Sequence, residues 1–436
     1  MKTKLLLLLF VVSISFGQHR TCGTDAYMES LLANPEMKKQ YIDLQKQFES
    51  ELERLTNAQQ QRNGSSALST NATIRIPVAI HYPSVANTST ETVKNCLRLL
   101  AQKQVAILNA DYNATNTDIS LWADASVFYP GVNIGNMDVS WEIATQNHPS
   151  DSGLSNGNLA ITFGTHFLSA GDISCPTCNQ DSSWAGYCNL VVTNIPGGNT
   201  LGFSPLGGSP SAGMTVVIDN NAFGATMTGT PSSCSGFVPS GSYNLGRTLT
   251  HELGHFFNLY HTFQNCSNSN CNTQGDRVCD TPPLGTPTYG CPSDGFVAGC
   301  DGSTSALTMN YMDYTNDACM YMFTVGQANR MLAWYNTLIA QSQLQTNVLA
   351  NNDFVKNNFS IAPNPNKGIF SIQLAEAIDN YSVIIIDPLG REIFNAEYNQ
   401  TTDLVQNIEL DNALIGMYFV TIQSKGAQTT KKIIIE

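Results

Sequence analysis

Charged side chains are scarce in this chain of 436 residues, in which Asp, Glu, Lys and Arg together make up only 13%. Cations are the rarer sign, because 21 Lys and Arg stand against 34 Asp and Glu and give a formal net charge of −13. This balance argues against nucleic acids and anionic membrane surfaces as partners. Asn, Ser, Thr and Gly are plentiful instead, a composition typical of the solvated surfaces of extracellular proteins.

Long apolar runs are missing beyond the N-terminus. The chain starts with a basic stretch (residues 1–4), continues with an apolar one (5–12) and reaches small side chains at 15–17. This order predicts a secretory signal peptide over residues 1–17, cut before Gln18. Its apolar stretch is too short for a membrane-spanning helix, and no other segment is long enough. We therefore expect an exported, soluble mature protein without a transmembrane segment.

Internal repeats are absent too, and the length suffices for two or three separate domains. Helix-prone sequence at 30–55 gives way to residues 57–73, whose Gln, Asn, Ser and Thr predict a flexible linker. From residue 74 onward, expected strands and helices alternate, which predicts an α/β half with a twisted sheet. The expected strands are 74–81, 139–144 and 190–194, and the expected helix is 93–108.

The second half of the chain changes character three times. A helix is expected at 242–259, followed by an irregular stretch at 262–316 that needs covalent staples or ions to stay ordered. After a last helix at 324–339, short strands with turns between them predict a β-sandwich of about 80 residues. The expected organisation is a signal peptide (1–17), a propeptide with linker (18–73), a main domain (74–340), a second linker (341–358) and the sandwich (359–436).

Twelve cysteines fit an oxidising compartment. In a cytosolic protein the Cys175-x-x-Cys178 pair would indicate a zinc or redox motif. With a signal peptide present, disulfides are the better interpretation, each stabilising a loop-rich region by roughly 2–4 kcal/mol. The twelve are Cys22, Cys96, Cys175, Cys178, Cys188, Cys234, Cys266, Cys271, Cys279, Cys291, Cys300 and Cys319.

Histidine is scarce, yet three of the seven histidines lie between residues 251 and 261. On a helix, His251 and His255 project from one face with Glu252 beside them. This H-E-x-x-H pattern is typical of two zinc ligands and the general base of a metalloprotease. His261 completes the longer form of the motif, in which the third ligand follows a chain reversal. The alternative is that these histidines are ordinary surface or core residues.

Three neutral imidazoles leave zinc a fourth position for water, whose pKa falls from about 15.7 toward 7. Glu252 would take the proton of that water as it attacks a carbonyl and pass it to the leaving amine. Asn258 stands where the longer motif has Gly with positive φ. Because Asn is the non-glycine residue that best tolerates this conformation, we expect the turn to survive.

Residues 251–263 resemble the active-site helix of the pappalysin family of metzincin proteases, in its bacterial cytophagalysin branch. Residues 309–314 and 317–327 resemble the family's Met-turn block, and weaker likeness extends the match over about 74–339. The resemblance implies an α+β metzincin-like domain with a zinc cleft between an α/β upper lobe and an irregular lower lobe. It also implies that Met312 lies beneath the zinc and that Tyr314 lies nearby, where a phenol could donate to the developing oxyanion.

Residues 274–282 resemble the family's calcium-binding loop. Asp276, Asp280 and Thr281, with Cys279 among them, lie on a Gly- and Pro-shaped turn whose oxygens suit a hard cation. Without the resemblance, a solvated turn would be the simpler interpretation.

The resemblance also implies which cysteines pair across this region. It suggests the disulfides Cys271–Cys300 and Cys291–Cys319. Cys266, Cys279 and the cysteines of the middle of the chain stay unassigned.

Cys22 lies just after the expected signal cleavage and resembles the cysteine-switch residue of family propeptides. A thiolate can occupy zinc's open position and keep the enzyme latent. The alternatives are a disulfide partner or a stray thiol. If Cys22 stays unpaired, eleven cysteines remain, and Cys96 is the expected second free thiol. Activation would then need a cut between residues 22 and 74, for which Arg54 and Arg62 are candidate sites.

The C-terminal segments 361–370, 387–390 and 414–420, with the closing Lys431 and Lys432, resemble the sorting domain of the type IX secretion system of Bacteroidetes. The residues alone support only a β-sandwich, which could equally bind carbohydrate or protein. The resemblance implies the type IX machinery as a partner and passage across the outer membrane, with release or surface attachment.

Together these observations predict a secreted, monomeric zinc endopeptidase of extracellular proteins, made as a latent zymogen and carrying calcium. Asp317, in the segment after Tyr314, would favour basic substrate side chains. One alternative is a surface adhesin with a non-catalytic metal site, which would have no use for Glu252. Another is an esterase or amidase that uses the same zinc.

Overall fold

The computed structural model describes most of the chain, and the rest is left aside. The described residues are 20–61, 74–164, 171–197, 199–225, 234, 236–237, 239, 241–266, 270–349, 359–374, 380–387, 391–399, 403–410, 414–424 and 427–436. The expected signal peptide, most of the first linker including Arg62, and the end of the second linker therefore lie outside the described residues.

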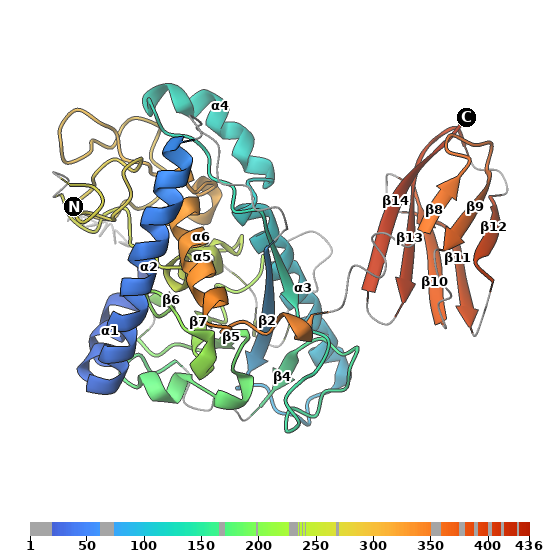
Figure 1. The fold of residues 1–436 in the computed structure, drawn as a ribbon, viewed down its shortest axis with the longest axis horizontal. Coiled ribbons are helices and arrows are strands. Elements are labelled where there is room, and N and C mark those ends of the chain that lie inside the picture. Colours follow the sequence, from blue (N-terminus) through green and yellow to red (C-terminus); the bar gives the residue numbers. More distant parts are fainter. Residues whose placement is uncertain are drawn as a thin grey trace, which may run out of the picture.

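A seven-stranded sheet forms the frame of the larger part of the molecule (Figure 1). Its order is β1-β6-β7-β5-β2-β3, with β4 also paired to β2. All pairs of neighbouring strands are parallel except the pair β6–β7, which is antiparallel. Strand β2 is apolar and buried along nearly its whole length, as expected of a mostly parallel sheet covered on both faces. The strands are β1 Thr21–Cys22, β2 Ile74–Tyr82, β3 Val139–Ile143, β4 Ile161–Phe163, β5 Cys188–Thr193, β6 Thr200–Phe203 and β7 Thr215–Asp219.

Three helices pack around this sheet and share its hydrophobic core: α3 (Glu91–Tyr112), α5 (Arg247–Phe256) and α6 (Val325–Ala340). Thr324 and Gln327 form a capping box that starts α6. The helix expected from residue 242 begins only at Arg247, because Gly246 takes a left-handed conformation with φ 80°. Shorter elements are α4 Trp122–Ala125, η1 Thr117–Leu121, η2 Ser126–Phe128, η3 Pro176–Asn179, η4 Ser182–Trp184, η5 Pro210–Ala212, η6 Asp317–Cys319 and η7 Thr346–Val348.

The N-terminal segment forms two helices, α1 (Thr24–Ala33) and α2 (Pro35–Gln61), where the sequence predicted one. The break falls at Asn34, which is extended with ψ 119° as residues before proline usually are. The Asn34 side chain accepts hydrogen bonds from the backbone N–H groups of Glu36 and Met37 and so begins α2. Helix α2 runs alongside α6 (Figure 1).

Disulfides staple the loop-rich stretch between α5 and α6. The structure joins Cys266 to Cys300, Cys271 to Cys279 and Cys291 to Cys319. The suggested Cys271–Cys300 pair is therefore wrong. The physical reason is a tight turn at 275–277, with positive φ at Gly275 and Arg277, which folds Cys271 back onto Cys279.

Elsewhere Cys175 bonds to Cys178 and Cys96 bonds to Cys234. The expectation of a free Cys96 is wrong, because α3 brings it against the loop that carries Cys234. The free cysteines are Cys22 and the buried Cys188.

The segment after α6 was expected to be a polar linker, but its first part packs on the main domain. Val348 is fully buried, and its carbonyl accepts hydrogen bonds from the N–H groups of Thr145 and Gln146. The apolar side chains of Leu344, Val348 and Leu349 were the signal for this packing.

The C-terminal part is all-β, as predicted, with a four-stranded sheet of order β11-β10-β13-β14 and a three-stranded sheet of order β12-β9-β8. Burial alternates along β9 and β10, and the inward side chains form a separate hydrophobic core. The strands are β8 Phe359–Ala362, β9 Ile369–Leu374, β10 Asn380–Ile386, β11 Glu392–Asn399, β12 Val405–Glu409, β13 Gly416–Ser424 and β14 Ala427–Ile435.

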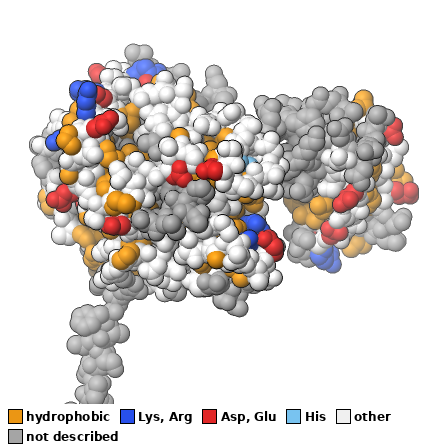
Figure 2. Space-filling model, turned by 90° about the horizontal axis from the view of Figure 1, so that it is seen from below, with side chains coloured by type: hydrophobic (Ala, Val, Ile, Leu, Met, Phe, Trp, Pro, Cys, Tyr) orange, Lys and Arg blue, Asp and Glu red, His pale blue; other side chains and the backbone are white. Residues whose placement is uncertain are grey.

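Charged side chains are sparse and scattered on the face seen in Figure 2, in keeping with the composition. Among the described residues, none of the helices is both long and apolar enough to cross a membrane.

Candidate metal centre

Three histidine side chains converge at one point beneath the sheet. His251 and His255 extend from one face of α5, and His261 follows the turn after the helix. The Nε2 atom of His255 lies 3.2 Å from Nε2 of His251 and 3.1 Å from Nε2 of His261. All three side chains are buried.

The backbone fixes the orientation of two of these rings. Nδ1 of His251 donates to the carbonyl of Tyr311 at 2.6 Å, and Nδ1 of His255 donates to the carbonyl of Leu259 at 2.7 Å. Because Nδ1 carries the proton in each ring, the Nε2 lone pairs point at the common centre. This is the arrangement in which histidine ligands are usually held.

Such a cluster suits a cation. Three lone pairs about 3 Å apart repel one another unless a positive charge lies between them. Burial lowers the pKa of His255 to about 4 and lowers those of His251 and His261 well below the usual value, so that the rings stay neutral. Neutral imidazoles at this spacing fit the donor set of a tetrahedral metal site.

Asn258 forms the turn between the second and third histidines. It has φ 70°, and its N–H donates to the carbonyl of His255 at 2.8 Å, while the N–H of Leu259 donates to the carbonyl of Gly254. The Asn258 carbonyl accepts a hydrogen bond of 2.8 Å from Nε of the buried Arg330. The turn thus forms with Asn in the left-handed position that glycine usually fills.

Met312 lies directly under α5 and is fully buried. A Cβ atom on Gly254 would meet the Met312 sulfur at 2.5 Å, so a larger residue at this position of the helix would displace the Met312 side chain. The hydroxyl of Tyr314 lies 3.3 Å from Nε2 of His261, at the edge of the cluster.

Glu252 lies beside the histidines with a carboxylate that is almost fully buried. Burial raises its pKa to about 7, partly offset by the positive charge of Arg20. The neighbouring strand β6 makes room for it, because a Cβ on Gly202 would meet the Glu252 Cγ at 2.7 Å. The carboxylate therefore faces the space next to the three Nε2 atoms.

Cys22 completes the cluster from the N-terminal segment. Its sulfur and one nitrogen of each of His251, His255 and His261 all lie within 4.8 Å of one another. The thiol donates to the Glu252 carboxylate at 3.3 Å, and the Cys22 N–H donates to the hydroxyl of Tyr314 at 3.0 Å. Burial raises the pKa of Cys22, whereas a bound cation would favour the thiolate.

Strand β1 carries this cysteine by pairing in parallel with β6 at the end of the sheet. The carbonyl of Gly202 accepts a hydrogen bond of 2.9 Å from the N–H of Gly23. Without β1, strand β6 would be the free edge of the sheet, next to Glu252.

Arg20 was not singled out in the sequence, yet its side chain is buried beside the cluster. Its Nη1 lies 3.9 Å from Oδ1 of Asp317, and it also donates to the sulfur of Met320. Oδ2 of Asp317 accepts hydrogen bonds from the N–H groups of Leu245 and Arg247, which start α5. Asp317 thus caps the active helix with one oxygen and faces a basic side chain with the other.

The network around Arg247, which was also not predicted from the sequence, anchors the start of α5. The Arg247 guanidinium is buried, bonds to Asp111 and the hydroxyl of Tyr311, and reaches Asp118 at 3.0 Å. Because the carbonyl of Tyr311 accepts a hydrogen bond from His251, this network connects α3 to one ring of the histidine cluster. Its only sequence signal was the placement of Asp111 and Asp118 in and just after an apolar helix.

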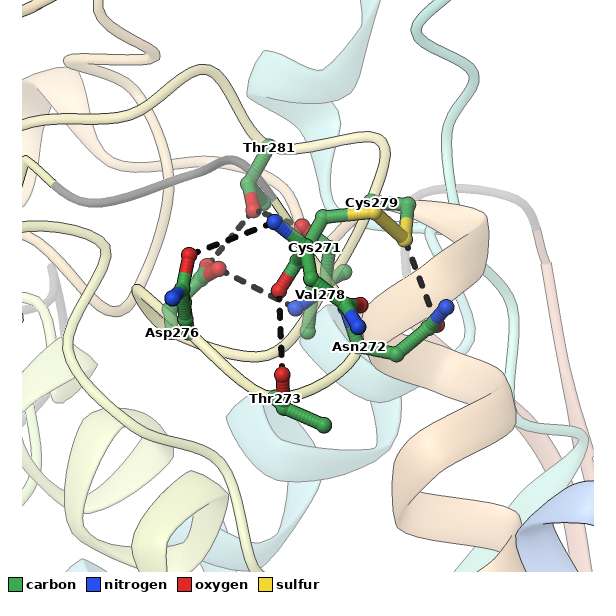
Figure 3. The surroundings of a disulfide bond; sticks show 9 residues. Cys271, Asn272, Thr273, Asp276, Val278, Cys279 and Thr281 are labelled. Carbon is green, nitrogen blue, oxygen red and sulfur yellow. Dashed lines mark hydrogen bonds between the residues drawn. A yellow bond between two sulfur atoms is a disulfide. The ribbon is translucent and has the colours of Figure 1, made fainter.

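The expected calcium loop is folded around its own side chains (Figure 3). Asp276 accepts hydrogen bonds from the Thr281 hydroxyl at 2.6 Å and the Val278 N–H at 3.1 Å. Asp280 instead accepts from Thr324 and from the N–H of Gly326 at the start of α6. The Cys279 sulfur is bonded to Cys271, so this residue could offer a cation only its carbonyl oxygen.

Comparison with known proteins agrees with this geometry. The family model for pregnancy-associated plasma protein-A matches residues 236–336, which hold the three histidines, Met312 and Tyr314. The model for the secretion system C-terminal sorting domain matches residues 360–436.

An extracellular metalloprotease of Arthroderma gypseum is 30% identical over 276 residues, which cover 62% of this chain and 75% of that protein. Extracellular metalloprotease 1 of Coccidioides posadasii is 40% identical over 150 residues, 34% of this chain and 49% of that protein, so the chain spans about half of it. A solved structure of a Tannerella forsythia promirolysin mutant is 26% identical, has a TM-score of 0.51, and covers 76% of this chain and 100% of that one.

These likenesses support a metalloendopeptidase that acts on proteins, is made as a zymogen and is secreted across the outer membrane by means of its sorting domain. None of them supports the adhesin alternative. The chain belongs to the pappalysin family of secreted metalloproteases.

Proposed function

We propose that the metal is zinc and that His251, His255 and His261 bind it, with Glu252 as general base and Tyr314 as oxyanion donor. The observation that carries this proposal is the convergence of three oriented Nε2 atoms beside a buried carboxylate and a phenol hydroxyl. When bound there, zinc acts as a Lewis acid toward a water molecule and a peptide carbonyl.

The chain's own residues supply the proton transfers. Glu252, with a pKa raised by burial, is basic enough to take a proton from the attacking water and acidic enough to give it to the leaving amine. Burial raises the pKa of Tyr314, so its hydroxyl stays protonated and can donate to a developing oxyanion. All the proposed metal-binding and catalytic residues come from one chain, so the site needs no second subunit. This supports the proposal that the protein is a monomer.

An extended substrate would pair with β6 once β1 has left, because β6 then ends the sheet next to Glu252. Asp317 would select a basic side chain in the substrate. The support is Arg20, whose buried guanidinium already lies against this carboxylate.

Latency would come from Cys22, whose sulfur lies at the open side of the three histidines. The proposed organisation is a signal peptide (1–17), a propeptide (18–73), a catalytic domain (74–340), a linker (341–358) whose first part packs on the catalytic domain, and a sorting domain (359–436). Arg54 is exposed on α2 and accessible to an activating protease, and Arg62 is the other candidate site.

Calcium remains part of the proposal at the 274–282 loop. The carboxylate of Asp276 is buried, and the partly buried carboxylate of Asp280 lies close enough to disfavour its charge. Burial raises the pKa of Asp276 to about 7, so a divalent cation that neutralised this charge would stabilise the loop.

The direct test is Glu252→Ala in the processed protein. We expect hydrolysis of casein to fall by about 10³-fold or more while one zinc per chain remains by elemental analysis. A peptide panel run beside ester substrates separates an endopeptidase from an esterase. Undiminished casein hydrolysis by Glu252→Ala would refute the proposal that Glu252 is the general base. Loss of zinc from this variant would refute the proposal that Glu252 is not itself a zinc ligand.

A further inference from the structure

Helix α2 lies away from the histidines, yet it touches the turn that connects two of them. The Gln45 and Asn258 side chains exchange two hydrogen bonds of 3.1 and 3.2 Å, amide to amide. A glycine at position 258 would have no side chain to offer. The residue that departs from the family motif is therefore the one that α2 contacts.

Aromatic and cationic groups surround this amide pair. Phe48 of α2 is fully buried, with its ring 4.8 Å from the Arg330 guanidinium carbon and 5.5 Å from the Trp334 ring. Arg330 also lies over the ring of Tyr260 at 5.5 Å. We call the surface made by Asn258, Tyr260, Arg330, Trp334 and Asn336 the α2-binding site.

Polar and charged contacts complement the packing at both rims of this site. The Asn336 amide donates to the Glu51 carboxylate at 2.8 Å. Arg277 lies 3.9 Å from Glu49, a weak contact because both side chains are solvent-exposed. The partner that fits is thus an amphipathic helix with a phenylalanine, an amide one turn before it and acidic residues after it.

The site is also compatible with water when α2 is absent. The Nη1 and Nη2 atoms of Arg330 have no hydrogen-bond partner beneath Phe48, so exposure would hydrate them. The Asn258 amide would likewise exchange Gln45 for water. A surface whose polar groups can be hydrated when α2 is absent, and which binds an aromatic side chain when α2 is present, suits a reversible partner.

We propose that this surface binds α2 as a separate chain, so that a cut within residues 62–73 leaves the propeptide attached and the enzyme latent. The inference rests on the proposed zymogen function and adds a second hold that is independent of Cys22. Complete activation then requires that α2 itself be cut or displaced.

The test uses the full chain with a site-specific protease sequence placed within residues 62–73 and with Glu252→Ala to prevent self-processing. Cys22→Ala removes the thiol, so that the cut propeptide is held without any bond between sulfur and a metal. We expect the cut propeptide to co-elute with the rest of the protein in size-exclusion chromatography at micromolar concentration. Separation of the two pieces on cutting would overturn the proposal.

Two substitutions measure the contacts. Phe48→Ala should weaken the association by on the order of 100-fold or more, because a fully buried aromatic ring is lost. Asn258→Gly should weaken it by roughly 10-fold through the two lost hydrogen bonds, while the turn is preserved because glycine accepts φ 70°. Glu53→Ala, on the exposed side of α2, is the matched control and should change nothing.

A double-mutant cycle tests whether the side chains of Gln45 and Asn258 interact directly. Gln45→Ala should cost little once Asn258 is already Gly, and fully additive losses would contradict direct pairing. With Glu252 and Cys22 intact, the cut parent protein should hydrolyse casein far more slowly than the cut Phe48→Ala protein. Equal rates would overturn the role in latency. If neither protein hydrolyses casein, the proposed protease function fails, while co-elution still decides the α2-binding site.

Discussion

Exchange of Asp317 for Asn removes one negative charge and keeps the oxygen that starts α5. Oδ2 of Asp317 accepts hydrogen bonds from Leu245 and Arg247, and an Asn amide oxygen can accept both. The other oxygen faces Arg20, and the side chains of this pair are 1% and 0% exposed. The substitution therefore separates the attraction for a basic group from the capping of the helix.

The magnitude follows from burial. Removing one partner of a buried charge pair usually costs about 3–5 kcal/mol, which is roughly 100-fold to several thousand-fold in an equilibrium or a specificity constant. Because the atoms of this pair are 3.9 Å apart and make no direct hydrogen bond, the lower limit applies. We expect Asp317→Asn to lower kcat/KM by about 100-fold for a peptide that has Arg directly after the scissile bond.

The assay compares two quenched fluorescent peptides that differ only in Arg or Met after the scissile bond. The Met peptide should change by less than about threefold, because it gains nothing from the charge. Asp317→Ala is the control that also removes the cap, and it should slow both peptides and lower the melting temperature. Equal losses for the Arg and Met peptides in Asp317→Asn would refute the reasoning.

Three further predictions follow from neighbouring contacts. In Phe48→Ala, which weakens the hold of α2, a further Cys22→Ala should raise casein hydrolysis by the uncut precursor by more than about tenfold, because no thiolate can then occupy the open metal position; an unchanged rate would exclude the switch. Gly202→Ala should displace Glu252 and lower kcat by about 100-fold with zinc retained, measured by steady-state kinetics and elemental analysis; full activity would contradict the close contact. The pKa of Asp276 rises from 3.8 to about 7 on folding, so between these values the folded state binds more protons and stability should fall as pH rises. Asp276→Asn should flatten the dependence of the melting temperature on pH in chelator, and calcium should flatten it in the parent; a slope identical in parent and variant would rule out Asp276 as its source.

The local features of the site could be predicted from the sequence, because spacing on one helix fixes their geometry. His251 and His255 lie four residues apart, and α5 places them on one face. The left-handed turn at Asn258 was likewise predictable from the tolerance of Asn for positive φ. Met312 and Tyr314 needed the family resemblance, since nothing in their own residue types distinguishes them from core.

Features that depend on distant packing could not be predicted. Arg20 and Asp317 meet only after the whole domain has folded, and no local pattern connects them. The disulfide pairing of Cys271 was missed because it depends on two positive-φ residues in one turn, of which one, Arg277, is not a glycine. The packing of residues 341–349 also depends on tertiary contacts, although its apolar side chains were a signal in the sequence. The late start of α5 instead follows from the left-handed conformation of Gly246.

The sorting domain follows the catalytic domain in the chain, which has a consequence for timing. Residues 360–436 are synthesised after the catalytic domain, so that domain is complete before its sorting domain exists. The Cys96–Cys234 bond spans 138 residues and closes only when α3 and the loop before α5 have come together. Such bonds form in the oxidising periplasm, where domains fold as units. We therefore expect the outer-membrane machinery to receive a folded, cross-linked cargo, and the cell to host a finished metal centre in its own envelope, where only the propeptide protects neighbouring proteins.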